Sequence, residues 1–287
     1  MGLRLCAGIW RFWYVRGHCT EGRHWCAAAL AKVPAGSVSA PLATTLSCSG
    51  VFASIQGDYE ASQTFHERSL SLRRELGDET GIAVSLNNLG SLAHDQGDYA
   101  RAGVLHEESL ALRRKLGDQQ GISVSLNNLA TVAHDQGAYD QARSMYQETL
   151  SIERSLSNPW GTAVVLSNLG QVAVDQGDYV SARAYLVECL EIRRFLGDRL
   201  RLPDTLDAFA SLAAATSDPL RAARLWGASE ALKKEIGSQG TTAERARREA
   251  RISAARAEVS GAASFDAAWA EGAAMAVEEA AEFTLRS

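Results

Sequence analysis

The sequence has little of what would mark a membrane-spanning or disulfide-bonded protein. Only five prolines occur in 287 residues, so helices can form with few interruptions. No apolar run approaches the ~20 residues of a membrane span, and Arg4, Arg11 and Arg16 break the apolar first twenty residues, unlike a signal peptide. The five cysteines form no C-x-x-C pair, which favours reduced thiols. We therefore expect a soluble, cytoplasmic, helical protein without membrane contact.

The sequence also lacks an excess of basic charge and a phosphate-binding loop. Its net charge is −5, with acids and bases interspersed, so nothing in the overall charge favours direct binding of nucleic acid. No G-x-x-x-x-G-K-[ST] segment occurs, so the residues that cradle nucleotide phosphates and Mg²⁺ are absent.

What the sequence does contain is a repeat of 40 residues. The segment GIAVSLNNLGSLAHDQGDYARAGVLHEESLALRRKLGD at 81–118 nearly recurs at 121–158 and, more loosely, at 161–198. Residues 44–78 contain the corresponding IQGDY and LGD motifs. A fixed period of this length indicates stacked units of supersecondary structure. The composition makes these units pairs of helices, so we predict an all-α solenoid.

Glycine followed by aspartate marks the helix boundaries inside each repeat. In the second regular repeat we predict helices over about 81–96 and 99–116, with Gly97 ending the first helix and Asp98 capping the second. In the third repeat Ala138 replaces the capping aspartate, at a cost of about 1 kcal/mol. Asn158 and Pro159 replace the next Gly-Asp pair and serve the same purpose.

The repeats divide the chain into four predicted segments. We expect an atypical tryptophan-rich helical hairpin and loop at 1–41, broken at Gly17, and four regular repeats at 42–199. A divergent repeat follows at 200–237, and the last segment, 238–287, begins with a linker at 238–242 and continues as C-terminal capping helices. Divergence at the ends fits a solenoid, whose terminal units must cover an apolar surface.

Each first helix of a repeat carries two stripes. In the second repeat the apolar stripe is Leu86, Leu89, Gly90 and Ala93, where the small Gly90 lets the next helix approach closely. The second stripe is polar, and we predict it to line a peptide-binding groove formed by Asn87, Asn88, Ser91, His94, Asp95, Asn127, Asn128, Thr131, His134, Asp135, Asn168, Gln171 and Asp175.

Two roles remain open for the asparagines of this polar stripe. An amide offers donors and an acceptor, so a ladder of Asn88, Asn128 and Asn168 could bind the backbone of an extended peptide. The same amides could instead bond to neighbouring helices and fix the repeat spacing. Asparagine is a poor helix former, and either role would explain its presence within a helix.

Other polar clusters favour structural roles. His94-Asp95 and His134-Asp135 are adjacent, so their side chains diverge by about 100°, and no nucleophile stands at a fixed offset; we expect no enzyme. His18, Cys19, His24 and Cys26 lack the paired spacing of a zinc site, so we expect no metal and no cofactor.

Two sets of arginines also need an explanation. The pairs at 73–74, 113–114 and 193–194 complement the helix dipole, although a basic rim for acidic peptides is the alternative. The arginines of the tail, at 245–256, alternate with glutamates, which is typical of a solvated helix face.

The repeats resemble a known family. Leu86, Leu89, Gly90, Ala93, Tyr99 and Ala102 match the tetratricopeptide repeat pattern, and LNNLG followed by QGDY resembles the ~40-residue subtype of kinesin light chains. The resemblance implies a right-handed superhelical solenoid of antiparallel helix pairs that binds a protein or an extended peptide.

A narrower resemblance covers nearly the whole chain. LRLCAGIWRFWYVRGHCTEGRHW at 3–25, the repeats, RAARLWGASEALKKEIG at 221–237 and FDAAWAEGAAM at 265–275 resemble the C-terminal region of bacterial signal-transduction ATPases tied to transcriptional regulators. It implies a sensor arm whose partner is an ATPase module, with this chain a stand-alone relative or a piece. A further hypothesis is that the chain forms a homo-oligomer through Trp10, Trp13 and Trp25.

Overall fold

The computed structural model describes residues 1–16, 18–236, 242–259 and 262–285. These residues form fifteen helices and no strand, which confirms the predicted all-α class. The chain divides into two compact units, Met1–Val132 (unit 1) and Ala133–Ser287 (unit 2). Gly17 and positions 238–241 of the expected linker lie outside the described residues.

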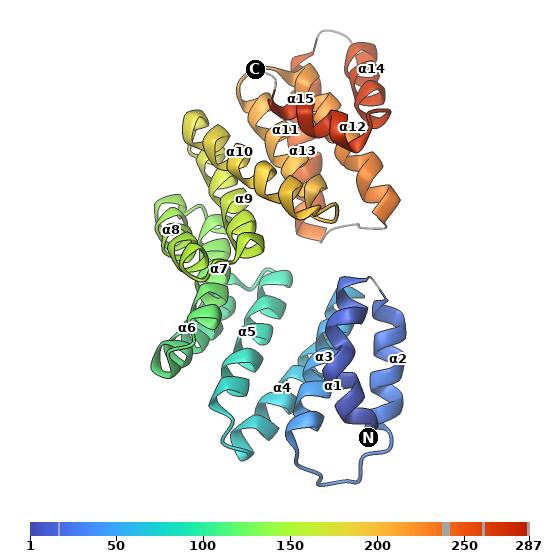
Figure 1. Cartoon of the computed structure of the whole chain (residues 1–287), viewed down its shortest axis with the longest axis vertical. Coiled ribbons are helices and arrows are strands. Elements are labelled where there is room, and N and C mark those ends of the chain that lie inside the picture. The colour runs from blue at the N-terminus through green and yellow to red at the C-terminus, as the bar shows by residue number, and fades with distance from the viewer. Residues whose placement is uncertain (17, 237–241, 260–261, 286–287) are drawn as a thin grey trace. The chain divides into compact units, whose positions relative to one another are not determined.

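Unit 1 is built from antiparallel helix pairs (Figure 1). We call the first helix of each regular repeat the A helix and the second the B helix. The hairpin of α1 and α2 packs on α3, and α3 to α6 follow as A and B helices in turn. The helices are α1 (Gly2–Val15), α2 (Cys19–Leu30), α3 (Ala40–Ile55), α4 (Tyr59–Glu75), α5 (Glu79–Asp95), α6 (Tyr99–Leu116) and α7 (Gln119–Asp135), the last of which continues into unit 2.

Unit 2 continues the alternation and then adds three helices. The A helices α9 and α11 pair with the B helices α10 and α12, and α13 to α15 pack around α11 and α12. The helices are α8 (Tyr139–Ser155), α9 (Pro159–Asp175), α10 (Tyr179–Leu196), α11 (Leu202–Ala215), α12 (Pro219–Ile236), α13 (Thr242–Glu258), α14 (Ala262–Ala273) and α15 (Val277–Leu285).

The predicted boundary signals act as expected. Gly117 ends α6 with a left-handed φ of 68°, and Asp98 begins the same helix by accepting the Arg101 backbone N–H at 3.1 Å. Asn158 caps α9 by accepting from Gly161 N–H at 3.2 Å. Ala138, which begins α8, makes no such bond. Helices α5 and α6 therefore fall within two residues of the predicted spans.

Small residues on the A helices let the B helices approach, as the sequence predicted. A Cβ added to Gly90 would lie 2.7 Å from Cε1 of His106, and one on Gly50 would lie 2.5 Å from Cε1 of His66. In unit 2 the same register holds Gly170 against Leu186. Two of the three positions thus bury a histidine, which the sequence pattern alone had not singled out.

A buried hydroxyl or thiol ties four of the B helices (α4, α6, α10 and α12) back to their A helices. Ser69 Oγ donates to the Ala43 carbonyl at 2.8 Å. The same bond, with the same spacing of 26 residues, recurs from three later positions on B helices: Ser109 to Ala83, Cys189 to Ala163 and Ser229 to Pro203. Each bond satisfies a buried polar group and helps to fix the relative height of the two helices in its pair.

Candidate functional site

The asparagines of the polar stripe tie neighbouring A helices together in unit 1. Asn88 on α5 donates its Nδ2 to Ser47 Oγ on α3 at 2.9 Å. One repeat later, Asn128 Nδ2 donates to Oδ1 of the buried Asn87 at 3.0 Å. These contacts support the role in repeat spacing for the amide donors. The remaining asparagines of the stripe are half-buried and also have interaction partners: Asn127 and Asn168.

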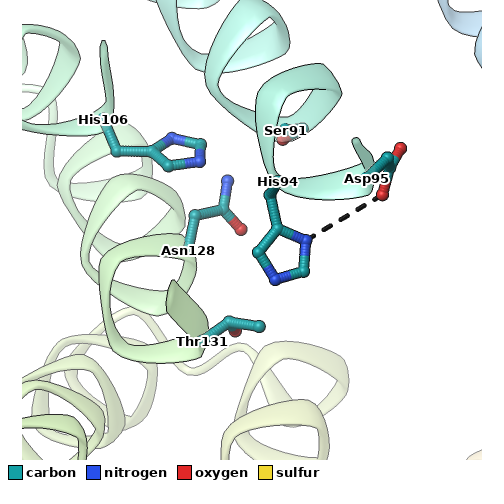
Figure 2. A pocket seen from close by; sticks show the side chains of 6 residues that line it. All are labelled: Ser91, His94, Asp95, His106, Asn128 and Thr131. Carbon is teal, nitrogen blue, oxygen red and sulfur yellow. Dashed lines mark ion pairs between the residues drawn. The ribbon is translucent and has the colours of Figure 1, made fainter. Parts of the chain in front are cut away.

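A pocket of about 150 Å³ lies beside the polar stripe of unit 1 (Figure 2). Side chains from α5, α6 and α7 line it, namely Ser91, His94, Asp95, His106, Asn128 and Thr131. All of these except His106 belong to the predicted stripe. His106 comes from a B helix and stands 40 residues after His66, a periodicity that was the available signal for it. The structure therefore brings five of the predicted residues together in one concave site.

His106 is the deepest group of this pocket. Its residue is 1% exposed, and its Nδ1 lies 3.2 Å from Asn87 Oδ1. Burial, with a smaller contribution from His94, lowers the pKa of His106 to about 4, so the ring is neutral at pH 7. Because an amide oxygen only accepts hydrogen bonds, Nδ1 carries the proton and Nε2 keeps its lone pair. Figure 2 shows the ring directed toward the pocket, which thus contains a buried acceptor.

The adjacent His-Asp pairs do not orient each other. His94 Nδ1 is 3.9 Å from Asp95 Oδ1, and Asp95 instead accepts from Ser54 Oγ at 3.2 Å. In unit 2, His134 Nε2 donates to Asp175 on the next A helix at 2.8 Å. The histidine therefore links two repeats.

In unit 2 the polar stripe is occupied by α13. Arg251 donates to Asp175 Oδ1 at 2.9 Å, to Gln171 Oε1 at 2.8 Å and to Ser211 Oγ at 3.2 Å. Arg247 pairs with Asp135, whose side chain is only 5% exposed. Three predicted groove residues thus bind guanidinium groups of the chain itself.

These contacts correct the interpretation of the tail arginines as a solvated face. Besides Arg247 and Arg251, Arg248 donates to Asp207 at 3.1 Å and to Glu230 at 2.8 Å. The guanidinium of Arg248 also lies 5.7 Å from the ring centre of Trp269. These three arginines face acidic groups on other helices of unit 2 because α13 folds back onto them, and the alternation with glutamates does not reveal this.

The pKa of Asp175 reflects its contact with Arg251 of α13. Burial alone would raise the pKa of Asp175, but the hydrogen bond from His134 and the charge of Arg251 outweigh it, so the pKa lies below its ordinary value. Asp175 is therefore ionised at neutral pH and pairs with Arg251 as a charged group.

We expect the three arginines to hold α13 in place. Replacing Arg247, Arg248 and Arg251 together by glutamine should speed amide hydrogen exchange in α13 at least ten-fold, since about 1.4 kcal/mol of lost interaction gives that factor. Exchange over 245–258 measures it, and Glu249→Gln, at an exposed site on the same helix, serves as control. Unchanged protection in the triple variant would show that the apolar contacts of Ile252 and Ala255 suffice.

The arginine pairs at the ends of B helices are divided between the interior and the solvent. Arg73 is buried and donates to Ser85 Oγ at 3.2 Å and to the Gly81 carbonyl. Arg193, three repeats later, is also buried and donates to Thr205 Oγ1 at 2.7 Å. The first arginine of each pair is therefore structural, which argues against the basic-rim alternative for it, and the second is exposed.

The N-terminal hairpin buries thiols and exposes aromatic rings. Cys26 and Cys48 lie in one apolar cluster with Trp13, and burial raises the pKa of each of these thiols to about 12. Within the described ranges, no three His, Cys, Asp or Glu side chains are arranged to hold a metal ion. Trp13 is buried, whereas Trp25 is 52% exposed. Assembly through this end stays a prediction.

The fold and the stripe together define an α-helical repeat scaffold. Residues 41–115 and 81–155 match one tetratricopeptide repeat family, and residues 162–196 match a second family of the same description. These matches together cover about half of the sequence. The chain belongs to the tetratricopeptide repeat family. The kinesin-light-chain subtype and the cytoplasmic location stay predictions.

Solved structures share this fold at low sequence identity. The Rap conjugation gene regulator of the plasmid pLS20, in complex with the Phr* peptide, is 13% identical with a TM-score of 0.64, over 89% of this chain and 73% of that one. NprR in complex with its cognate peptide NprX is 16% identical with a TM-score of 0.57, over 89% and 79%.

A multidomain regulator shows the same similarity over part of its length. A signal transduction ATPase with numerous domains (STAND) and a tetratricopeptide repeat sensor, from Pyrococcus horikoshii, is 14% identical with a TM-score of 0.62. The match covers 88% of this chain but 41% of that protein. At such identities the similarity shows the fold alone. No curated protein matches the sequence. Among the described helices, none has the length and hydropathy needed to cross a bilayer.

Proposed function

We propose that this chain is a non-catalytic binding scaffold whose polar stripe takes an extended peptide or a segment of a partner protein. The observation that carries the proposal is the pocket on the stripe of unit 1, where Ser91, Asp95 and His106 converge. The structures of Rap with Phr* and of NprR with NprX lend support, because both pair this fold with a peptide.

The contacts of the stripe suggest which atoms meet the peptide. The Nδ2 donors of Asn88 and Asn128 bond to neighbouring A helices, so their carbonyl oxygens are the groups that would accept peptide N–H donors. Ser91, His94 and Asp95 lie one and two turns further along the helix and would contact side chains. In unit 2 the corresponding contacts would involve Asn168, Gln171 and Asp175, and a peptide there would have to displace Arg251.

A stripe variant tests the proposal against a matched surface variant. Ser91→Lys places a long cation in the pocket, and Glu107→Lys introduces the same residue at an exposed position of α6. Each chain is used to capture partners from the native host, and the affinity of the recovered partner is then measured. We expect Ser91→Lys to lower that affinity at least ten-fold and Glu107→Lys to leave it unchanged. Equal affinities would contradict the stripe as the binding surface.

Alanine at the asparagines would be a poorer probe. Asn88→Ala removes the bond to Ser47 and leaves the hydroxyl of this buried residue without that donor, which costs about 1 kcal/mol. An effect on binding could then not be separated from loosened repeats.

A second candidate function is the sensor arm of a nucleotide-switched transcriptional regulator. It rests on the shared fold with the tetratricopeptide sensor of the P. horikoshii STAND protein. In this case the main partner is an ATPase module, and an in-frame P-loop domain in the DNA preceding the codon for Met1 would support it. An ordinary promoter and ribosome-binding site there would argue for the peptide-binding scaffold acting by itself.

A further inference from the structure

The occupant of the stripe in unit 2 shows which chemistry this surface binds. The two guanidinium groups that enter it contact acceptors at equivalent positions of successive repeats. Arg251 donates to Asp175 and Gln171, and Arg247 pairs with Asp135. Arginine has five N–H donors in a planar fork and no acceptor. A surface made of carboxylate, amide and hydroxyl oxygens complements such a group.

The pocket of unit 1 repeats this register forty residues earlier. Asp95 precedes Asp135 by one repeat, and Ser91 precedes Thr131 by one and Gln171 by two. Asp95 is partnered by Ser54 and by His94 at 3.9 Å. Among the described residues of unit 1, no lysine or arginine pairs with Asp95. The carboxylate thus stands where unit 2 has a bound guanidinium, and it pairs with no guanidinium or ammonium group of the described part of unit 1.

A second, independent feature of the pocket points to a donor-rich ligand. His106 is 1% exposed and uses Nδ1 for its bond to Asn87. No hydrogen bond from the described residues reaches its Nε2, which keeps a lone pair directed at the pocket (Figure 2). A ligand that brings N–H groups to both Asp95 and His106 would supply a donor to this acceptor and to the carboxylate.

We propose that the pocket lined by Ser91, Asp95 and His106 binds the guanidinium group of an arginine in a partner segment. The inference rests on the proposed function and names the chemistry of its ligand. Lysine is the weaker candidate, because a single ammonium cannot span the carboxylate of Asp95 and the ring nitrogen of His106 as a planar fork does.

The α13 sequence itself supplies a probe. A fluorescent peptide of residues 242–258 is titrated into the full chain and followed by anisotropy, beside a peptide with glutamine at positions 247, 248 and 251 and one with lysine there. We expect the arginine peptide to bind, the lysine peptide to bind several-fold more weakly, and the glutamine peptide to bind at least ten-fold more weakly.

Variants of the chain locate the site. Asp95→Asn keeps the side-chain shape, removes the charge, and should weaken binding of the arginine peptide at least ten-fold. Glu107→Gln removes the same charge from an exposed position of unit 1 and should have no effect. A loss with Asp175→Asn but not with Asp95→Asn would place the peptide in unit 2, by exchange with α13, and overturn the assignment.

The two proposals fail in different ways. If capture of a partner depends on Ser91 but the arginine and glutamine peptides bind alike, the guanidinium assignment is wrong and the binding scaffold stands. If the arginine peptide binds through Asp95 but Ser91→Lys leaves capture of the partner unchanged, the guanidinium assignment of the pocket is right and the stripe is not the surface that binds the partner.

Discussion

Gly272→Ala should destabilise unit 2 by about 3 kcal/mol or more, above the usual range of about 1–3 kcal/mol for added methylenes. The new Cβ would lie 1.8 Å from the carbonyl oxygen of Arg224 and 2.5 Å from its carbonyl carbon. On the facing helix, a Cβ on Gly227 would lie 2.2 Å from the Trp269 carbonyl oxygen. The backbones of α12 and α14 therefore cross in contact, and no side chain can move to relieve the clash.

Urea denaturation followed by tryptophan fluorescence measures this effect, because Trp226 is buried on α12 beside the crossing. Gly103→Ala is the matched control. Gly103 lies within α6, and a Cβ there would meet nothing within 4 Å, so this change should stabilise the helix by about 0.5–1 kcal/mol. Equal midpoints for Gly272→Ala and the wild type would show that α14 shifts without cost.

Acid should destabilise unit 1 through its two buried histidines. Burial lowers the pKa of His66 and of His106 to about 4 each, against about 6.5 in an unfolded chain. Between these values the unfolded state binds more protons. Stability is therefore lost as the pH falls from about 6.5 to about 4, by about 3 kcal/mol for each histidine.

Denaturation midpoints at pH 7.5 and pH 5 test this expectation. His106→Leu copies the residue that unit 2 has at this register, Leu186, and should flatten the dependence on pH. His24→Leu, at an exposed position of α2, should keep the slope of the wild type. Asp175 cannot account for the effect, since its lowered pKa contributes only below the ordinary aspartate value of about 3.8. An unchanged slope in His106→Leu would contradict the burial of a neutral ring.

The repeat pattern predicted much of the fold because its signals are local. Gly97 and Asp98 place a left-handed residue beside a capping side chain, and the observed helix α6 begins where these residues predict. The small Gly90 predicted close packing, and the structure adds that the partner is His106. The sequence pattern did not show that His106 is buried against Gly90, because a histidine within a B helix is equally compatible with an exposed position.

The polar stripe was predictable as a set of residues but not as a set of contacts. Forty-residue periodicity places Asn88 and Asn128 at equivalent positions, and it leaves open whether their amides meet a ligand or a neighbouring helix. Only the tertiary structure shows the bonds to Ser47 and Asn87. The choice depends on the distance between stacked helices, which no single repeat contains.

The sequence by itself determined the class of fold, the repeat boundaries, the two stripes of each A helix and the family, since all of these follow from patterns within about forty residues. The tertiary structure decided that α13 lies on the stripe of unit 2 and that His106 enters the pocket of unit 1. Arg247 meets Asp135 across 112 residues of sequence, and such a pairing depends on how the C-terminal helices fold back. The contacts of α13 with α11 and α12 join segments that are distant in the sequence, so this return has no local signature.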